Sequence, residues 1–309
     1  MARFKTSPLP DQSRFGAIVT DLDPTDIDEQ AVRSALHDLW IDRGVVVFRG
    51  MPGGMETQLR LSEIFGEPEI HPMMAGTDIK TEHKALAPIE FERDKGNIYE
   101  IDGEVRGGYL PWHFDGAYVD RINHGGILRP EVLPRRGGDT GFLDQIAAYD
   151  LLPDRLKQRI EGLEVLYSYQ PDMTANKFGP RADRLVQMSE LFRTGSKHPS
   201  VQVRAIHPIV YRQADTGKTV LHLSPWFAEG IVGMEDPEGD ALLAEVTACV
   251  LQPDLMYFHH WREGDMVLWD NWRMLHCATG VPPDETRIMR RTTIVGDYGL
   301  GRREVLPQS

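Results

Sequence analysis

The feature that most limits the fold of this chain is a series of short apolar runs broken by Gly, Pro and Asp. Such runs occupy residues 109–118, 126–132, 140–143, 163–169, 201–212, 219–223, 265–270 and 286–295. Their length and their content of β-branched and aromatic residues are typical of strands. Because helices do not alternate regularly with these runs, the pattern argues against a parallel dinucleotide-binding sheet. It favours a mainly β protein, with an antiparallel double sheet or barrel and flanking helices.

Helical spacing of apolar residues is found in only a few segments. It predicts helices over residues 26–43, 55–65, 144–160 and 237–251. Asp26 and Glu29 have the spacing of a capping box, and Gly44 can end the first of these helices.

The segment at about 170–204 shows no clear strand pattern and is locally basic. It contains Lys177, Arg181, Arg184, Arg193, Lys197 and Arg204 against Asp172, Asp183 and Glu190. Such a segment is either a lid that attracts an anion or a solvated surface loop. Because no linker or repeat divides the chain, we expect a single domain of residues 1–309 with a lid-like insertion at this segment.

The charge of the chain argues against one broad class of partner. The 309 residues include 34 Lys and Arg against 47 Asp and Glu, which gives a net charge of −13. Since this field repels phosphates, we expect neither nucleic acid nor a membrane surface as partner. The chain shows no signal-peptide or membrane-helix pattern and has only two cysteines, Cys249 and Cys277, so we expect a cytoplasmic protein.

Two histidines and one acidic residue form the first candidate site. His113 and Asp115 lie in a strand-like run, where side chains two positions apart share one face. His276 lies in another extended segment. Two imidazoles and one carboxylate on one side of a metal form the facial triad of non-haem Fe(II) oxygenases. Taken alone, a His-x-Asp triplet is weak evidence, because a buried histidine is more often hydrogen-bonded than metal-bound.

Two arginines strengthen the hypothesis. Arg287 and Arg291 follow His276 in a predicted strand, and their positions have the same parity, so both guanidinium groups should point the same way. A guanidinium binds a carboxylate through two charge-assisted hydrogen bonds.

Several ordered motifs together resemble those of the TauD/TfdA family of Fe(II)/2-oxoglutarate-dependent dioxygenases. They are His113-x-Asp115, Gly137-Gly138-Asp139-Thr140, Trp269-Asp270-Asn271, His276 and the run from Arg287 to Arg291. The resemblance extends over residues 15–297. It implies a double-stranded β-helix of the jelly-roll, cupin-like kind, with Fe(II) as cofactor, 2-oxoglutarate as co-substrate and O2 as oxidant.

The resemblance also implies roles for single residues. His113, Asp115 and His276 match the iron ligands of the family. Thr140 and Arg287 match the residues that bind the distal carboxylate of 2-oxoglutarate. Arg291 matches a second arginine, which either binds the anionic group of the substrate or supports the 2-oxoglutarate site.

Substrate residues are expected near the metal motif. His71 matches a taurine-contacting histidine of the family, whereas Met74 and Tyr109 stand where the taurine enzyme has a tyrosine and an asparagine. This departure argues against taurine itself. Tyr109 and Phe114 are close enough to the metal motif to line an apolar pocket.

The resulting expectation is an oxidoreductase that hydroxylates an aliphatic C–H bond of a small organic anion. Sulfonates, carboxylates and aryloxy or alkyl acids are the candidate classes, with C–heteroatom cleavage where the attacked carbon carries a heteroatom. The alternatives are a metal-dependent hydrolase or isomerase and a non-catalytic jelly-roll binder. Arg287 and Thr140 favour the dioxygenase, because a hydrolase has no need for an arginine placed to bind a dicarboxylate. The family commonly forms oligomers, so we expect a dimer or tetramer.

Overall fold

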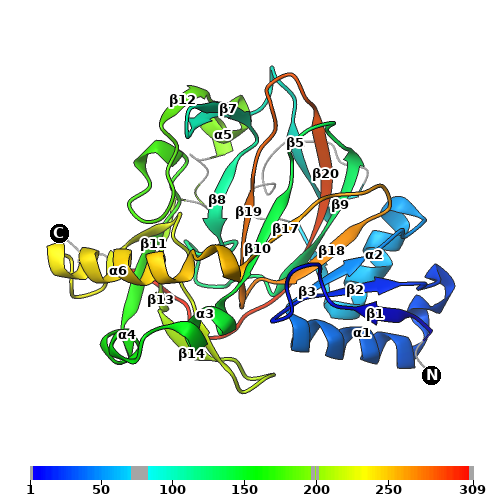
Figure 1. Ribbon diagram of the computed structural model, residues 1–309, viewed down its shortest axis with the longest axis horizontal. Coiled ribbons are helices and arrows are strands. Elements are labelled where there is room, and N and C mark those ends of the chain that lie inside the picture. Colours follow the sequence, from blue (N-terminus) through cyan, green and yellow to red (C-terminus); the bar gives the residue numbers. More distant parts are fainter. Residues whose placement is uncertain (1–2, 71–82, 196–198, 200–201, 306–309) are drawn as a thin grey trace.

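The strand-rich pattern folds into a set of mostly antiparallel sheets, described here from a computed structural model (Figure 1). The structure describes residues 3–70, 83–195, 199 and 202–305. His71 and Met74, two of the expected substrate residues, lie outside this described part.

The larger sheet forms one wall of the molecule. Its strand order is β1 (Lys5–Ser7), β2 (Ala17–Thr20), β3 (Val45–Phe48), β18 (Met266–Asp270), β9 (Gly125–Val132), β20 (Arg287–Ile294) and β4 (Pro68–Glu69), and β5 (Leu86–Phe91) also pairs with β20. The β2–β3 pair is parallel, and the other pairs in this sheet are antiparallel.

A smaller sheet faces the larger one. Its order is β17 (Met256–His259), β10 (Thr140–Asp144), β19 (Met274–Ala278) and β8 (Leu110–His113). Phe142 and Met274 from this sheet belong to the same buried cluster as Val47, Trp269 and Met289 from the larger sheet. Two sheets closed over one apolar core are the architecture of a jelly roll, so the predicted mainly β double-stranded β-helix is confirmed.

Helices α1 (Gln30–Arg43) and α2 (Gly54–Phe65) cover the outer face of the larger sheet (Figure 1). Leu36, Trp40 and Leu61 pack there against Phe48 and Leu268. These helices confirm the first two predicted segments, and the left-handed Gly44 (φ 73°) ends α1 as expected.

The predicted capping box at Asp26 is wrong. Residues 24–28 form a short 3-10 helix, because the Asp23 carboxylate accepts a hydrogen bond from the Thr25 amide at 2.8 Å. Helix α1 therefore begins only after Glu29, whose side chain makes no capping hydrogen bond.

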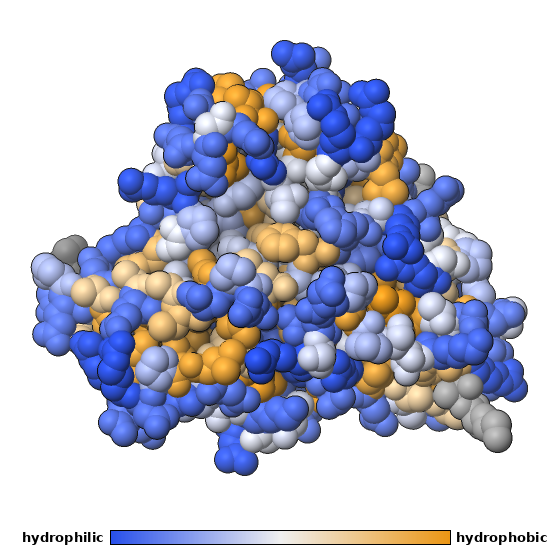
Figure 2. All heavy atoms as spheres, in the orientation of Figure 1, coloured by the Kyte–Doolittle hydropathy of each residue, from blue (hydrophilic) through white to orange (hydrophobic). Residues whose placement is uncertain are grey.

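A third sheet and several helices stand beside the two main sheets. The sheet has the order β16 (Ala228–Ile231), β11 (Glu164–Ser168), β13 (Arg204–Pro208) and β21 (Arg302–Arg303), and α6 (Pro237–Val250) contacts β16. The helix predicted at 144–160 is two helices, α3 (Gln145–Leu151) and α4 (Asp154–Ile160), because the intervening Pro153 cannot continue α3. Figure 2 shows hydrophobic residues gathered on the face around α6 and α3, within a mostly hydrophilic outline.

The described part of the 170–204 segment contains a strand and a helix that were not predicted. It contains β12 (Arg184–Gln187), which pairs with β6 (Ile98–Ile101), and helix α5 (Glu190–Gly195). Three of its basic side chains form ion pairs with residues elsewhere in the chain: Lys177 with Asp240, Arg184 with Glu100, and Arg204 with Glu229 and Glu304. These pairs neutralise much of the local charge, so the expected attraction of an anion by this segment has little support. Its role as a lid stays a prediction.

Two sequence expectations concern the environment of the chain. In the described ranges, no helix combines the length and apolar character needed to cross a lipid bilayer. Cys249 and Cys277 are both free thiols.

Candidate active site

His113, Asp115 and His276 come together at the paired strands β8 and β19 of the smaller sheet. The Nε2 atom of His276 lies 3.4 Å from Oδ2 of Asp115, and the Nε2 atom of His113 lies 3.7 Å from Oδ1. One potential ligand atom from each residue lies within 4.8 Å of the others. Both histidines are buried, which is the environment of a small closed metal site rather than of a solvated charge cluster.

The way Asp115 reaches the site differs from the sequence prediction. Strand β8 ends at His113, and Asp115 lies in the turn that follows. Asn271 holds this turn: its Oδ1 accepts a hydrogen bond from the Asp115 amide at 2.8 Å, and its Nδ2 donates to the Asp115 carbonyl at 3.0 Å. The carboxylate is therefore aimed by a side chain from the turn after β18, not by the alternation of a strand.

The surroundings of the three side chains suit a divalent cation. Nδ1 of His113 lies 2.7 Å from the Pro111 carbonyl, which fixes the ring and leaves Nε2 free to face the site. Burial lowers the pKa of His276 to about 4, so this imidazole is neutral. Burial alone would raise the pKa of Asp115, but Arg291, His276 and His113 together hold it well below its usual range. Two imidazoles and one carboxylate are the donor set that Fe(II) accepts.

A buried carboxylate oxygen without a hydrogen bond supports the same conclusion. Oδ2 of Asp115 is buried and has no hydrogen-bond partner in the described residues. Nη2 of Arg291 lies 2.8 Å away, within ion-pair distance, but its N–H group is not aimed at this oxygen. A buried carboxylate oxygen without a hydrogen bond is costly unless a cation binds it. The residues present therefore fit a metal ion.

Arg287 and Thr140 form a second binding element beside the metal residues. Nη2 of Arg287 donates to the Thr140 hydroxyl at 3.2 Å, and Nε donates to the Gly138 carbonyl at 3.0 Å. Arg287 is only 7% exposed, and no carboxylate lies within ion-pair distance of it in the described chain. Burial accordingly lowers its pKa to about 10, although it remains charged at neutral pH. A buried cation without a counterion fits the distal carboxylate of 2-oxoglutarate.

The glycine motif before Thr140 makes room for this arginine. Gly138 adopts a left-handed conformation (φ 82°), and a Cβ atom there would lie 2.8 Å from Pro134 and 3.2 Å from Cδ of Arg287. Any larger residue would strain the backbone and push Arg287 away from Thr140.

Arg291 lies closer to the metal residues than Arg287 does. It is 5% exposed, its guanidinium lies 5.1 Å from the Trp269 ring centre, and Nε and Nη2 make no hydrogen bond in the described chain. Both arginines line the same cavity, as their equal strand parity predicts. A buried guanidinium with unpaired N–H groups is suited to bind an anion.

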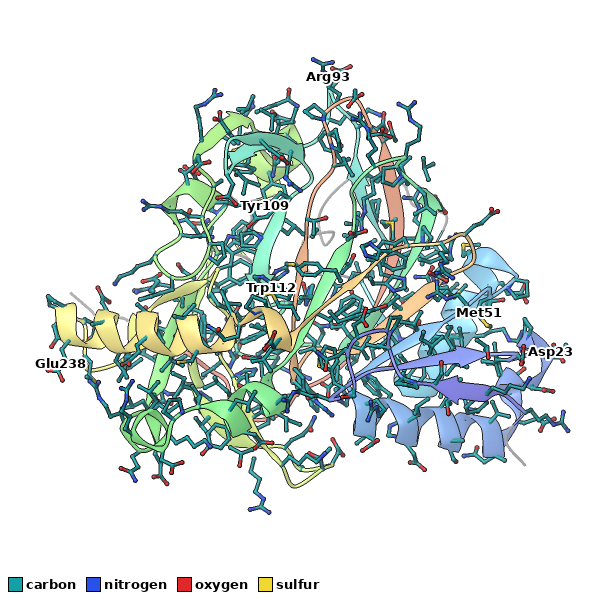
Figure 3. All side chains as sticks on the ribbon, in the orientation of Figure 1. Asp23, Met51, Arg93, Tyr109, Trp112 and Glu238 are labelled. Atoms are coloured by element: carbon teal, nitrogen blue, oxygen red, sulfur yellow. The ribbon has the colours of Figure 1, made fainter. Side chains whose placement is uncertain are left out.

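The cavity lined by both arginines, His113 and Asp115 has a volume of about 210 Å³ and mainly apolar walls. Its aromatic lining residues are Phe91, Tyr109, Tyr118, Tyr169, Phe192, Trp226 and Phe227. Tyr109 immediately precedes β8, and Trp112 lies on that strand (Figure 3). Phe192 and Ser189 bring the 170–204 segment to the cavity wall.

Phe114 does not line this cavity, contrary to the prediction. Its side chain is 0% exposed, and its ring stacks on His222 with centroids 4.2 Å apart, within the core. His113 and Asp115 on either side of it face the cavity instead, so Phe114 points the opposite way. Phe114 is thus next to the metal residues in the sequence, but its side chain lies outside the cavity.

Two residues at the site carried no functional role in the sequence interpretation. Asn271 was visible only as part of the Trp269-Asp270-Asn271 motif, and Trp261 donates a hydrogen bond from its indole to the Thr140 hydroxyl at 3.0 Å. The register of the predicted β18 strand could have suggested Asn271. No local signal marks Trp261, because its contact depends on the pairing of β10 with β17.

Comparisons with known proteins agree with this geometry. Residues 5–293 match the model of the taurine catabolism dioxygenase TauD, TfdA family. The (S)-phenoxypropionate/alpha-ketoglutarate-dioxygenase of Sphingobium herbicidovorans is 31% identical over 95% of this chain and 96% of its own length. An alkylsulfatase of Acinetobacter baylyi is 28% identical over 96% of this chain and 88% of its own length.

Among solved structures, a taurine dioxygenase from Burkholderia xenovorans has a similar fold. The TM-score is 0.72 at 22% sequence identity, and the match covers 98% of this chain and 97% of the other. The family match spans both sheets, the His113, Asp115 and His276 cluster and the Arg287 site. The chain belongs to the taurine catabolism dioxygenase TauD, TfdA family and is an Fe(II)- and 2-oxoglutarate-dependent dioxygenase.

Proposed function

We propose that this enzyme hydroxylates an aliphatic C–H bond of a small organic anion with an apolar or aromatic body. The observation that carries the proposal is the position of Arg291, a buried cation whose Nε and Nη2 make no hydrogen bond in the described chain, in a mainly apolar cavity beside Asp115. A pocket of this kind binds the anionic end of a ligand through the arginine and its apolar body through the ring faces.

The chain's own residues divide the work of binding. His113, Asp115 and His276 would hold the iron, and Arg287 with Thr140 would bind the distal carboxylate of 2-oxoglutarate. When bound, iron and 2-oxoglutarate supply the oxidation: O2 is consumed, 2-oxoglutarate gives succinate and CO2, and one oxygen atom enters the C–H bond. The buried walls around Tyr118 and Phe227 exclude water from the reacting carbon.

The names of the relatives narrow the substrate class. A phenoxypropionate dioxygenase and an alkylsulfatase both have names that refer to a substrate with oxygen bonded to an alkyl carbon. Hydroxylation of that carbon produces a hemiacetal-like product, in which the C–O bond breaks to give a carbonyl compound and a released phenol or sulfate. We infer that an aryloxy acid or an alkyl sulfate is a better substrate for this chain than taurine, which lacks an apolar body.

The first experiment tests metal and co-substrate without a substrate. Fe(II)-loaded protein is titrated with 2-oxoglutarate under anaerobic conditions, and the visible charge-transfer absorption of the chelate is recorded. We expect a saturable band that is lost in His113→Ala. Absence of the band with iron fully bound would contradict the assigned metal and co-substrate residues.

The second experiment tests the role of Arg291. Succinate release is measured with phenoxypropionate, hexyl sulfate and taurine for the parent and for Arg291→Gln. Arg290→Gln is the matched control, because Arg290 lies on the same strand, forms ion pairs with Glu90 and Glu131, and does not itself line the cavity. In the parent, we expect faster succinate release with phenoxypropionate or hexyl sulfate than with taurine. The KM for that preferred substrate should rise in Arg291→Gln and stay unchanged in Arg290→Gln. A preference for taurine, or an unchanged KM in Arg291→Gln, would contradict the proposal.

The expected dimer or tetramer stays a prediction, which sedimentation would test.

A further inference from the structure

The Thr140 hydroxyl receives two hydrogen bonds and donates none in the described chain. Nε1 of Trp261 donates to it at 3.0 Å, and Nη2 of Arg287 donates at 3.2 Å. A hydroxyl group has two acceptor lone pairs and one proton. Because two N–H donors use both lone pairs, the remaining proton must be given to an acceptor that comes from outside the described contacts.

We propose that Trp261 is a positioning residue of the co-substrate site, which orients the Thr140 hydroxyl so that its proton is donated to the distal carboxylate of 2-oxoglutarate. This inference rests on the proposed assignment of Thr140 and Arg287 to that carboxylate. Without Trp261, the Thr140 hydroxyl can rotate and accept hydrogen bonds from other donors. Binding of 2-oxoglutarate must then orient the hydroxyl again, which weakens the affinity. A donor at Thr140 also polarises the hydroxyl and strengthens the hydrogen bond it donates.

The ring of Trp261 packs on a histidine that is itself fixed by buried polar contacts. Its ring packs edge-to-face on His259, with centroids 4.6 Å apart and an interplanar angle of 88°. Nε2 of His259 lies 3.0 Å from the Asp265 carboxylate, and Nδ1 lies 3.1 Å from the Tyr257 hydroxyl. Asp265 in turn pairs with Arg49 at 2.6 Å. These hydrogen bonds hold the His259 ring in place, and His259 in turn holds the Trp261 ring that packs on it.

His260, the neighbour of His259 in sequence, does not share this role. Its side chain is 81% exposed and pairs with Asp139, whereas His259 is fully buried, so the two histidines point to opposite faces. The adjacent pair is therefore not a second metal site. His259, the buried member of the pair, is the one that packs on Trp261.

The competing explanation is that Trp261 only fills space next to the core. Substitution by Phe separates the two explanations, because Phe keeps an aromatic ring but has no N–H group. Trp261 is only partly buried, which makes the variant tolerable, and Trp261→Leu is a second variant without a donor. Trp272→Phe is the matched control, because Trp272 is equally half-buried and its indole donates to the Ile122 carbonyl, away from Thr140.

The test measures 2-oxoglutarate affinity by calorimetry on Mn(II)-loaded protein under anaerobic conditions, without turnover. We expect Trp261→Phe to weaken 2-oxoglutarate binding about threefold to tenfold, the effect of one hydrogen bond, while Mn(II) affinity and the Trp272→Phe control stay at the parent value. In a Thr140→Val background, Trp261→Phe should have no further effect, because its target hydroxyl is absent.

Each other outcome has a definite meaning. An unchanged 2-oxoglutarate affinity in Trp261→Phe and Trp261→Leu, or an equal loss with and without the Thr140 hydroxyl, overturns the role of Trp261. If Thr140→Val and Arg287→Lys also leave the affinity unchanged, the proposed co-substrate residues fail as well. If those two variants weaken binding and the Trp261 variants do not, only the inference about Trp261 fails.

Discussion

His113 and His276 face each other as paired residues of strands β8 and β19, with ring centroids 4.3 Å apart. The relative position of the two imidazoles is therefore set by the register of the smaller sheet. The next strand, β10, places Gly141 opposite Cys277, the neighbour of His276 in sequence. The packing around this glycine thus controls the geometry of the metal residues.

We predict that Gly141→Ala disturbs the metal site without touching a ligand. The new Cβ atom would lie 2.6 Å from Sγ of Cys277 and 2.7 Å from the Trp112 ring, so these side chains on β19 and β8 must shift. We expect about 1–3 kcal/mol less stability and about tenfold weaker Mn(II) binding. Chemical denaturation and metal titration measure these changes. Gly230→Ala is the control, because its Cβ would meet no atom closer than 3.9 Å. Equal metal affinity in both variants would show that β10 packing does not position the ligands.

Substitution of Arg287 should affect co-substrate binding in particular. Arg287→Lys keeps the charge but loses the forked geometry that bonds Thr140 and Gly138 together. We expect 2-oxoglutarate affinity to fall about tenfold to a hundredfold, as for the loss of a charged hydrogen bond. Calorimetry with Mn(II)-loaded protein gives the affinity, and Arg290→Lys on the outer face of β20 provides the control. A similar effect in both variants would point to general damage to the strand.

A buried ion pair below the site should dominate stability. Arg273 binds Asp144 through two hydrogen bonds of 2.8 Å, and both side chains are 2% exposed. Asp144→Asn keeps the cap on the Ile146 amide but leaves Arg273 as an unpaired buried cation. We expect a loss of about 3–5 kcal/mol in the free energy of unfolding. In the exposed pair of Arg155 and Glu245, Glu245→Gln should change the free energy of unfolding far less, because solvent screens this pair. Urea denaturation distinguishes these values, and equal losses would argue against the burial of the charge as the cause.

The histidine at position 207 should make the protein sensitive to acid. His207 is fully buried, and burial lowers its pKa to about 4 despite its contact with the Val119 carbonyl, which acts in the opposite direction. In the unfolded chain its pKa is near the usual 6.5, so as the pH falls below this value the unfolded state takes up the proton first. Between about pH 7.5 and about pH 5, this residue alone should remove about 2 kcal/mol of stability.

The corresponding measurement compares the parent with His207→Gln. The free energy of unfolding is determined by urea denaturation at both pH values, and the decrease should be smaller in the variant by about 2 kcal/mol. Identical decreases in the two proteins would mean that other groups cause the acid sensitivity.

Local patterns in the sequence already determined much of this protein. The short apolar runs predicted β8, β9, β10, β18 and β20 of the two main sheets, because alternation and β-branched residues act within a few residues. Strands β1, β2, β4, β5 and β17 lie outside the predicted runs. The equal parity of Arg287 and Arg291 predicted that both guanidinium groups would reach one cavity, which they do. The break at Pro153 was equally local, and the predicted single helix at 144–160 ignored it.

Only the tertiary structure decided which side chains meet. Phe114 and Asp115 are neighbours in sequence, yet Asn271 holds the turn that sends Asp115 into the site and Phe114 into the core. Trp261 reaches Thr140 across 121 residues, and Arg204 of the basic segment finds Glu229 and Glu304 on other elements. Such contacts depend on strand register and on packing between distant segments, and the period of any one segment carries no information about them.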